Sequence, residues 1–222
     1  MTASALRAED LYRFFRTGGE EILALRGVSL AVESGETVVV AGPSGSGKST
    51  LLSCLAGLDE PAGGRVTVGG EQLSHRPEAV RARVRGRRIG VLLQSRNLIT
   101  HLSVQNNIRI AQTAGRRQRN RPTVGLLLDQ VGLTAHRHSR PAQLSGGELA
   151  RAGLAVALAN APDIVLADEP TGELDGRTEQ HILTLLRDQA GRGAALLIVT
   201  HSAATVAAAD RVITLTDGRI TT

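Results

Sequence analysis

The chain has 222 residues, of which 41% are hydrophobic and 21% are charged, so it is long enough to fold around a substantial core. Its net charge is +5, and its single cysteine excludes a disulfide within one chain. No apolar run approaches the roughly 20 residues that span a bilayer, so we expect any membrane role to come through a partner.

The chain predicts two kinds of sheet. Residues 30–32 and 65–68 are typical of a small antiparallel sheet. Four short apolar runs predict strands buried on both faces of a parallel sheet, at residues 37–41, 89–93, 164–167 and 194–200. Helical stretches lie between these runs, at residues 48–56, 177–190 and 202–208. This alternation predicts an α/β fold with right-handed crossovers.

A helical insertion is predicted within that α/β core. Residues 95–160 are helix-rich, lack a convincing strand and are interrupted at Pro122 and Pro141. We therefore expect a helical subdomain between the second and third buried strands.

A glycine-rich loop follows the first buried strand. It matches the phosphate-binding pattern G-x-x-x-x-G-K-[ST], with the residues Gly42, Pro43, Ser44, Gly45, Ser46, Gly47, Lys48, Ser49 and Thr50. Backbone N–H groups in such a loop surround an anion, and the next helix points its positive end at it. Lys48 is expected to reach the β- and γ-phosphates of a nucleotide, and the Ser49 hydroxyl to ligate Mg²⁺. Lys48 is also the only lysine among 26 lysine and arginine residues, which indicates a position that needs a compact ammonium.

Reactive side chains follow two more of the predicted strands. Asp168 and Glu169 come directly after residues 164–167. We expect Asp168 to lie beside the Mg²⁺ ion and Glu169 to polarise an attacking water. His201 follows the last strand and is expected to hydrogen-bond both the γ-phosphate and Glu169. Because the carboxyl ends of parallel strands meet at one edge, these residues predict a single site.

A second anion site is predicted before an alanine-rich helix that runs to about Asn160. Its residues are Ser145, Gly146, Gly147 and Glu148, which follow Leu144. The serine and glycines present N–H groups at the helix start. Since the chain already has a complete phosphate loop, two anion sites for one nucleotide make sense if they belong to different subunits.

Together these motifs resemble the ABC transporter ATPases, across nearly the whole chain. The match includes the signature at residues 144–148, the glutamine Gln94, residues 171–175 and His201. The resemblance implies a P-loop NTPase (RecA-like) core with a small antiparallel β subdomain and an inserted α-helical subdomain. The whole chain, 1–222, would be one nucleotide-binding domain, with its core at 1–94 and 161–222 and the helical signature subdomain at 95–160.

The resemblance also implies an assembly and further site residues. Two copies would pack head to tail, with each ATP between the phosphate loop of one copy and the signature of the other. Gln94 would join Mg²⁺ to the helical subdomain that contacts the permease, and Asp175 would belong to the nucleotide site. Phe15 would stack on adenine because it precedes the Gly18-Gly19 turn, whereas Tyr12 and Phe14 point elsewhere along the strand.

We therefore expect an ATP-hydrolysing subunit that uses Mg²⁺ and powers a separate integral membrane permease. Its other partner would be a second copy of itself, at the cytoplasmic face of the membrane. Residues 22–30, residues 167–172 and Glu148 resemble the lipoprotein-release and macrolide-export ATPases, which favours export or mechanical transmission. The alternative is an ATP-driven regulator of a cell-envelope process, acting through a membrane partner without cargo.

The positive charge raises nucleic-acid binding as another interpretation. Most of the excess lies in two runs, Arg76, Arg81, Arg83, Arg85, Arg87 and Arg88, then Arg116, Arg117, Arg119 and Arg121. Neither run is interleaved with aromatic residues that stack bases, so we expect no nucleic-acid partner. A solvated arginine-rich face is favoured, with anionic lipid headgroups or an acidic partner as alternatives.

Three places depart from the family's pattern. Leu149 and Ala150 stand where relatives usually carry polar residues. Leu92 and Leu93 precede Gln94 where an aromatic is common, and residue 173 is Glu where Asn is frequent. None of these changes removes a predicted phosphate or metal contact, so we expect an active ATPase.

Overall fold

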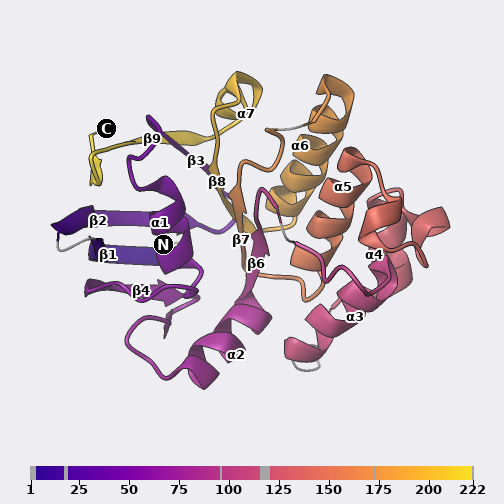
Figure 1. The fold of residues 1–222 in the computed structure, drawn as a ribbon, viewed down its shortest axis with the longest axis horizontal. Helices are drawn as coiled ribbons and strands as arrows, with labels where there is room; N and C mark the ends of the chain where they lie inside the picture. The colour runs from indigo at the N-terminus through magenta and orange to yellow at the C-terminus, as the bar shows by residue number, and fades with distance from the viewer. Residues whose placement is uncertain (1–3, 18–19, 96, 116–120, 173, 222) are drawn as a thin grey trace.

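A six-stranded sheet forms the centre of the molecule, in the order β10-β9-β3-β8-β7-β6 (Figure 1). The computed structural model describes residues 4–17, 20–95, 97–115, 121–172 and 174–221. The strands of the central sheet are β3 (Thr37–Ala41), β6 (Ile89–Leu92), β7 (Ile164–Asp168), β8 (Ala195–Val199), β9 (Arg211–Thr216) and β10 (Arg219–Ile220). Five of them pair in parallel, and β10 folds back antiparallel on β9. The four predicted apolar runs therefore coincide with β3, β6, β7 and β8.

Alternate residues of the buried strands enter two hydrophobic cores on opposite faces of this sheet. In β3, Val38 and Val40 belong to one core and Val39 to the other. Leu197 and Ile198 of β8 divide in the same way. Because both faces are covered, these strands are continuous apolar runs, which made them easy to predict.

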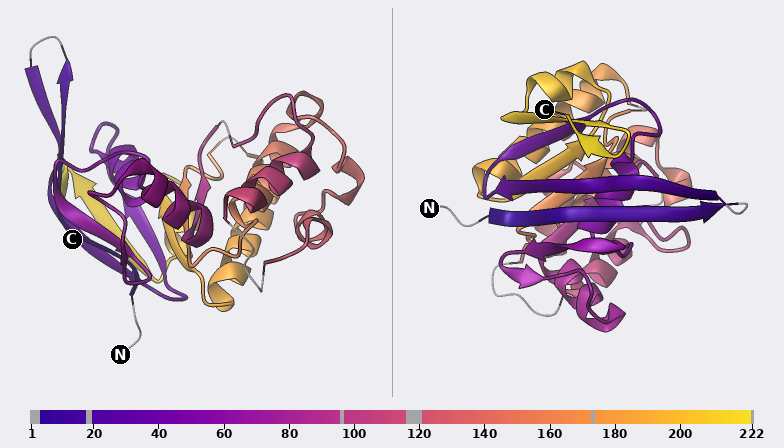
Figure 2. Two further views of the ribbon diagram at one scale, coloured as in Figure 1. Left: turned by 90° about the horizontal axis from the view of Figure 1, so that it is seen from below. Right: turned by 90° about the vertical axis from the view of Figure 1, so that its left-hand side faces the viewer.

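The first core is closed by an antiparallel sheet in the order β2-β1-β4-β5 (Figure 2). Its strands are β1 (Ser4–Thr17), β2 (Glu20–Glu33), β4 (Gly63–Val68) and β5 (Glu71–Gln72). Helix α1 (Lys48–Leu55) buries Leu51 and Leu55 in the same core as Leu6 of β1. The predicted segments 30–32 and 65–68 lie within β2 and β4. Strand β1 was expected only around Phe15; its first half was not predicted, because charged residues such as Arg7 and Glu9 alternate with its buried ones.

The second core lies under helices on the other side of the central sheet (Figure 1). They are α3 (Val104–Ala114), α4 (Val124–Gln130), the 3₁₀ turns η1 (Thr134–His136) and η2 (Pro141–Gln143), α5 (Gly146–Ala157) and α6 (Gly176–Gly191). Helix α5 ends at Ala157 rather than near Asn160. The Asn160 side chain instead donates hydrogen bonds to the carbonyls of Gly86 (2.9 Å) and Ala111 (2.8 Å). Among the described residues, no helix is both long and apolar enough to cross a membrane.

All of the first arginine run except Arg76 lies in a further helix, α2 (Glu78–Arg88), which was not predicted because Val84 is its one buried residue. Arg81 forms ion pairs with Glu60 and Glu78, both at 2.7 Å. Three more arginines of this helix also have acidic partners: Arg85 with Glu78, Arg87 with Glu71, and Arg88 with Glu71 and Asp163. These ion pairs neutralise much of the positive charge of α2. The pairing is typical of a solvent-exposed helix face.

The second arginine run lies largely outside the described residues, as do Gly18, Gly19 and Glu173. Its last member, Arg121, donates to the carbonyl of Gln112 at 3.1 Å. Helix α7 (Ala203–Ala207) completes the described fold.

The central strand β8 supports a stability prediction. We expect Leu197→Ala to lower the free energy of unfolding by about 2–5 kcal/mol, because Leu197 is fully buried and its truncation leaves a cavity. Leu126→Ala is the control, since Leu126 is 48% exposed. Urea denaturation checks both variants, and equal stabilities would contradict the assignment of β8 to the core.

Candidate active site

A cleft of about 920 Å³ opens at the carboxyl ends of the parallel strands. β6, β7, β8 and β3 are neighbours in the sheet, so the loops that follow them meet at this edge. The predicted residues that line the cleft are Phe15, Ser44, Gly45, Gly47, Lys48, Ser49, Thr50, Gln94, Asp168, Glu169 and His201. The structure thus brings together side chains from β1, α1 and the ends of three parallel strands.

The loop between β3 and α1 encloses the ammonium of Lys48. Its Nζ donates to the carbonyls of Gly42 and Pro43, both at 2.8 Å, and the residue is only 8% exposed. Gly42 and Gly47 have φ angles of 148° and 102°, and a Cβ on either would collide with a backbone carbonyl, of Leu215 or Ala24. The loop can therefore fold this tightly only with glycine at these two positions. It also holds the Lys48 ammonium where a bound phosphate could contact it.

The end of β7 places two carboxylates side by side. Asp168 is half-buried, and this burial raises its pKa; a hydrogen bond from Ser49 opposes the shift, and the neighbouring Glu169 charge adds to it. Hydroxyl, amide and carboxylate oxygens, as in Ser49, Gln94 and Asp168, are the donors that Mg²⁺ prefers. No group of three or more His, Cys, Asp or Glu that could hold a metal occurs among the described residues. Since Mg²⁺ is usually bound by few protein oxygens together with substrate phosphates, this donor set fits it.

Glu169 is fixed by the end of β8. Its backbone has a φ of 45°, and its N–H donates to the Val199 carbonyl at 2.8 Å. Carboxylate Oε2 accepts from Thr200 Oγ1 (3.1 Å) and from the backbone N–H of His201 (3.3 Å). The other oxygen, Oε1, is buried, makes no hydrogen bond among the described residues, and lies 3.5 Å from His201 Nε2. One oxygen is thus held by two hydrogen bonds from the protein, while the other lies beside His201 without a hydrogen bond among the described residues.

The sequence did not point to Ala24, Glu179, Val199 and Ser202, which also line the cleft. Glu179 of α6 accepts hydrogen bonds from Ser202 Oγ (2.6 Å) and from Thr171 Oγ1 (3.2 Å). It therefore links the loop after β7 to the start of α7. The sequence predicted only that a helix begins at Ser202; in the structure Ser202 caps α7 instead.

Gln94 lines both the cleft and an adjoining pocket of about 390 Å³. That pocket separates the end of β6 from the start of α5. Leu92, Leu93, Leu149 and Ala150 all line it. The apolar departures from the family's pattern therefore meet at one place, beside the loop that carries Gln94.

The signature residues lie away from the cleft, at the start of α5. Ser145 caps this helix, and its N–H and Oγ both donate to Glu148 Oε2, at 2.8 and 2.9 Å. These bonds lower the pKa of Glu148, the backbone bond from Ser145 most, and His136 Nε2 lies 3.2 Å from the other carboxylate oxygen. Figure 1 shows the central sheet between α5 and α1. Ser145, Gly147 and Glu148 are absent from the cleft lining, and Gly146 reaches only the adjoining pocket.

Asp175 also lies outside the cleft lining and caps α6. Its Oδ1 accepts from the backbone N–H groups of Arg177 and Thr178, both at 3.0 Å, and its Oδ2 accepts from Thr178 Oγ1 at 2.9 Å. Within one copy, the structure therefore assigns Asp175 to its own helix rather than to the cleft.

Phe15 is the one aromatic residue in the cleft lining among the residues that the structure describes. Its ring is 39% exposed. Tyr12 and Phe14 alternate to the opposite face of β1 and do not line the cleft.

Comparisons with known proteins agree with this geometry. The ABC transporter family matches residues 25–172. The chain is 40% identical over 221 residues to the lipoprotein-releasing system ATP-binding protein LolD of Chromohalobacter salexigens, covering 97% of this chain and 92% of that protein. It is 39% identical over 222 residues to the macrolide export ATP-binding/permease protein MacB of Burkholderia pseudomallei, covering 99% of this chain but 34% of that protein. The chain thus spans about a third of the length of MacB.

A solved structure is similar over nearly the whole chain. It is the dimeric, post-hydrolysis state of the ATP-binding cassette MJ0796 bound to ADP and phosphate, with a TM-score of 0.90 and 31% identity. The match covers 98% of this chain and 97% of that one. The predicted fold class and the predicted family resemblance are both confirmed.

The cap of α6 gives a pH-dependent prediction. Hydrogen bonds, first that from the Thr178 N–H, hold the pKa of Asp175 below its ordinary value. Its stabilisation is therefore complete above the unfolded pKa of about 3.9 and is lost as the pH falls through the lower folded pKa. We expect Asp175→Ala to lower the Tm at neutral pH, with the difference from the wild type shrinking in acid.

The matched control for this cap is Asp188→Ala, an exposed carboxylate on the same helix. Thermal melting from neutral pH into acid compares the two variants. A Tm loss that is the same for both, or independent of pH, would contradict the capping role of Asp175.

Proposed function

Because the chain belongs to the ABC transporter family, we propose that it is the ATP-binding, ATP-hydrolysing subunit of a system whose permease is a separate membrane protein. One observation carries this proposal. A phosphate-type loop with an enclosed lysine and a carboxylate with one oxygen that has no hydrogen bond among the described residues line the same cleft. A cation that binds phosphate and a base that activates water are the two groups that phosphoanhydride hydrolysis needs.

Each site residue has a role in this proposal. The loop residues Gly42, Pro43, Ser44, Gly45, Ser46, Gly47 and Thr50 surround the phosphates with backbone and hydroxyl donors. Lys48 exchanges its two loop carbonyls for the β- and γ-phosphates, and Phe15 stacks on the base. Ser49, Asp168 and Gln94 would hold Mg²⁺, which would supply positive charge to neutralise the charge that develops on the phosphates.

The catalytic step falls to Glu169 and His201. Oε1 of Glu169 accepts a proton from the attacking water, while Thr200 and the His201 N–H keep the carboxylate oriented through Oε2. The His201 ring lies 3.5 Å from Oε1 and would hydrogen-bond the γ-phosphate. Both side chains line the cleft, where Glu169 is mostly buried and His201 is more exposed.

A second copy of the chain completes the site. Ser145, Gly146, Gly147 and Glu148 form a capped helix start outside the cleft of their own copy, and Asp175 lies outside it too. The N-terminus of a helix binds anions such as phosphate. Since this one does not line the cleft of its own copy, we propose that it binds the γ-phosphate of the nucleotide held by the other copy. The cassette MJ0796 is dimeric in its structure with ADP and phosphate, which supports a site that uses two copies.

The membrane partner is proposed from the relatives. LolD belongs to a lipoprotein-releasing system and MacB joins an ATP-binding part to a permease. By analogy, this subunit would act on the cytoplasmic face of a membrane and drive export or mechanical transmission. We propose that the helices of residues 95–160 form the subdomain that contacts the permease, with Gln94 linking it to Mg²⁺.

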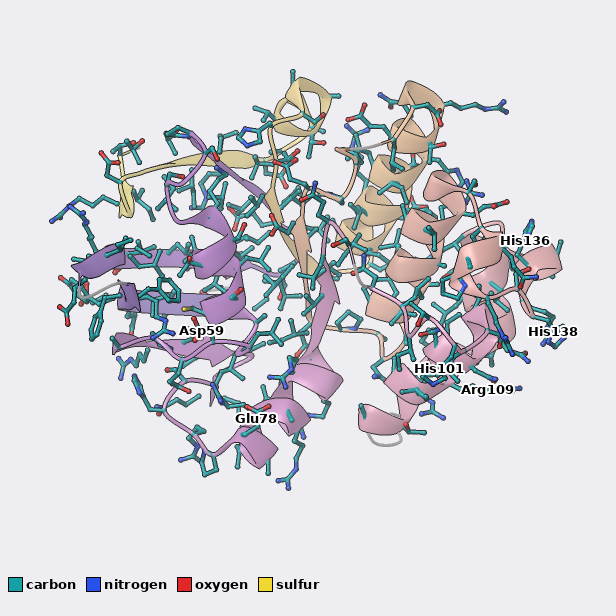
Figure 3. The ribbon with its side chains drawn as sticks, viewed as in Figure 1. Asp59, Glu78, His101, Arg109, His136 and His138 are labelled. Carbon is teal, nitrogen blue, oxygen red and sulfur yellow. The ribbon has the colours of Figure 1, made fainter. Side chains whose placement is uncertain are left out.

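Replacing Lys48 tests nucleotide binding. We expect Lys48→Ala to weaken ATP binding by about tenfold or more, because a charge-assisted contact to phosphate is lost. A fluorescent-ATP titration measures the Kd. Arg109→Ala removes a cation from the helical side, far from α1 (Figure 3), and should leave the Kd unchanged. Equal Kd values for both variants would contradict the role of Lys48.

Replacing Glu169 tests the chemical step. We expect Glu169→Gln to lower kcat by about 10²-fold or more while ATP still binds, since the amide cannot accept the proton. Gel filtration with ATP should then show an accumulated dimer. Asp188→Asn, an exposed carboxylate outside the cleft, serves as the control. Turnover in Glu169→Gln equal to that of the control would rule out Glu169 as the base.

A further inference from the structure

The ring of Phe15 is covered on one face by an arginine of its own strand. Arg13 and Phe15 are two residues apart on β1, so both side chains point to the same face of the antiparallel sheet. The guanidinium carbon of Arg13 lies 4.6 Å from the centroid of the ring. This is a cation–π contact, which restrains the orientation of a ring that is otherwise partly exposed.

Arg13 is itself held by a distant carboxylate. Its Nε donates to Asp59 Oδ2 at 2.8 Å, and its Nη2 donates to Asp59 Oδ1 at 2.9 Å. The two side chains are 25% and 29% exposed, so this ion pair is partly shielded from water. Two parallel hydrogen bonds to one carboxylate fix the plane of the guanidinium. A lysine ammonium at this position would make no such planar pair of bonds.

Asp59 is anchored to the helix that begins at Lys48. The backbone N–H groups of Leu58 and Asp59 both donate to the Ser53 carbonyl of α1, at 2.9 and 3.1 Å. Figure 3 shows Asp59 close to the strands of the antiparallel sheet. A continuous set of bonds therefore links α1, Asp59, Arg13 and Phe15, across the gap between the helix and β1.

A side pocket of about 250 Å³ lies along this set of bonds. It is lined by Phe15, Ser49, Thr50, Ser53, Leu58 and Asp59, three of which belong to the first turns of α1. Phe15 and Leu58 are exposed apolar side chains, at 39% and 49%. The pocket shares Phe15, Ser49 and Thr50 with the main cleft, so the two adjoin.

We propose that Arg13 and Asp59 are positioning residues for the nucleotide base. Asp59 holds Arg13, and Arg13 holds the Phe15 ring at a fixed place relative to the phosphate loop. The ring is then ordered before the nucleotide arrives, so less conformational entropy is lost on binding. This inference rests on the proposed function, because it needs a nucleotide whose phosphates occupy the loop.

The Arg13–Asp59 pair should affect binding of the nucleotide base and not of the phosphates. The Arg13–Asp59 pair touches neither the loop carbonyls nor the carboxylates at the end of β7, so it should not affect phosphate binding or the chemical step. Stacking on an aromatic ring tolerates any base. Loss of the pair should therefore weaken ATP and GTP alike and leave a ligand without a base unaffected.

The test compares Kd values for Mg²⁺ complexes of ATP, GTP and tripolyphosphate, together with KM and kcat for ATP. We expect Arg13→Gln to weaken ATP and GTP by about three- to tenfold, the range of a partly desolvated cation–π contact. KM should rise with kcat unchanged, and the Kd for tripolyphosphate should stay the same. Asp59→Asn should have the same effect, and the double variant no more than either single one.

Arg7→Gln is the matched control, an arginine on the same strand with a 56% exposed side chain. Thermal melting shows which variants fold, and Asp59→Asn alone decides the question if Arg13→Gln does not. Unchanged ATP affinity in these variants, equal weakening of tripolyphosphate, or additive effects in the double variant would overturn the proposal. A wild type that binds neither ATP nor tripolyphosphate would instead contradict the proposed function.

Discussion

The parallel pairing of β3 with β8, and of β8 with β7, is the constraint on which the candidate site depends. It brings three strand ends to one edge of the sheet. β3 leads into the loop with Lys48, β7 into Glu169 and β8 into His201. None of these residues is near another in sequence. Their common cleft exists because apolar strands buried on both faces can lie only in the middle of a layered fold.

Preformed backbone structure provides much of the site's chemistry. Glycines at positive φ turn the loop around the Lys48 ammonium, and a positive φ at Glu169 turns its carboxylate toward β8. At a residue other than glycine, such as Glu169, a positive φ costs free energy and persists only where neighbours hold it. Here the Val199 carbonyl and the Thr200 hydroxyl supply that support. The protein thus spends stability on placing donors and acceptors before a ligand binds, which lowers later reorganisation.

Sequence reasoning found the parts whose residues are adjacent and whose pattern is strong. The four buried strands, the loop around Lys48 and the start of α5 were all visible as short local motifs. The first half of β1 and helix α2 were missed, because charged side chains mask their few buried positions. The contact of Arg13 with Asp59 was also missed, since 46 residues separate them and they meet only in the folded chain, where β1 pairs with β4. Local pattern therefore predicts chemistry well and long-range ion pairs poorly.

Ser145 does not line the cleft of its own copy, so the proposed function requires two copies to share each site. The most direct test mixes two inactive variants, Lys48→Ala and Ser145→Arg, and measures ATP hydrolysis. In a head-to-tail dimer, the mixed pair contains one site with an intact loop and an intact signature, so the account predicts that mixing restores part of the activity. A mixture that stays as inactive as either variant alone, with both variants folded, would contradict it.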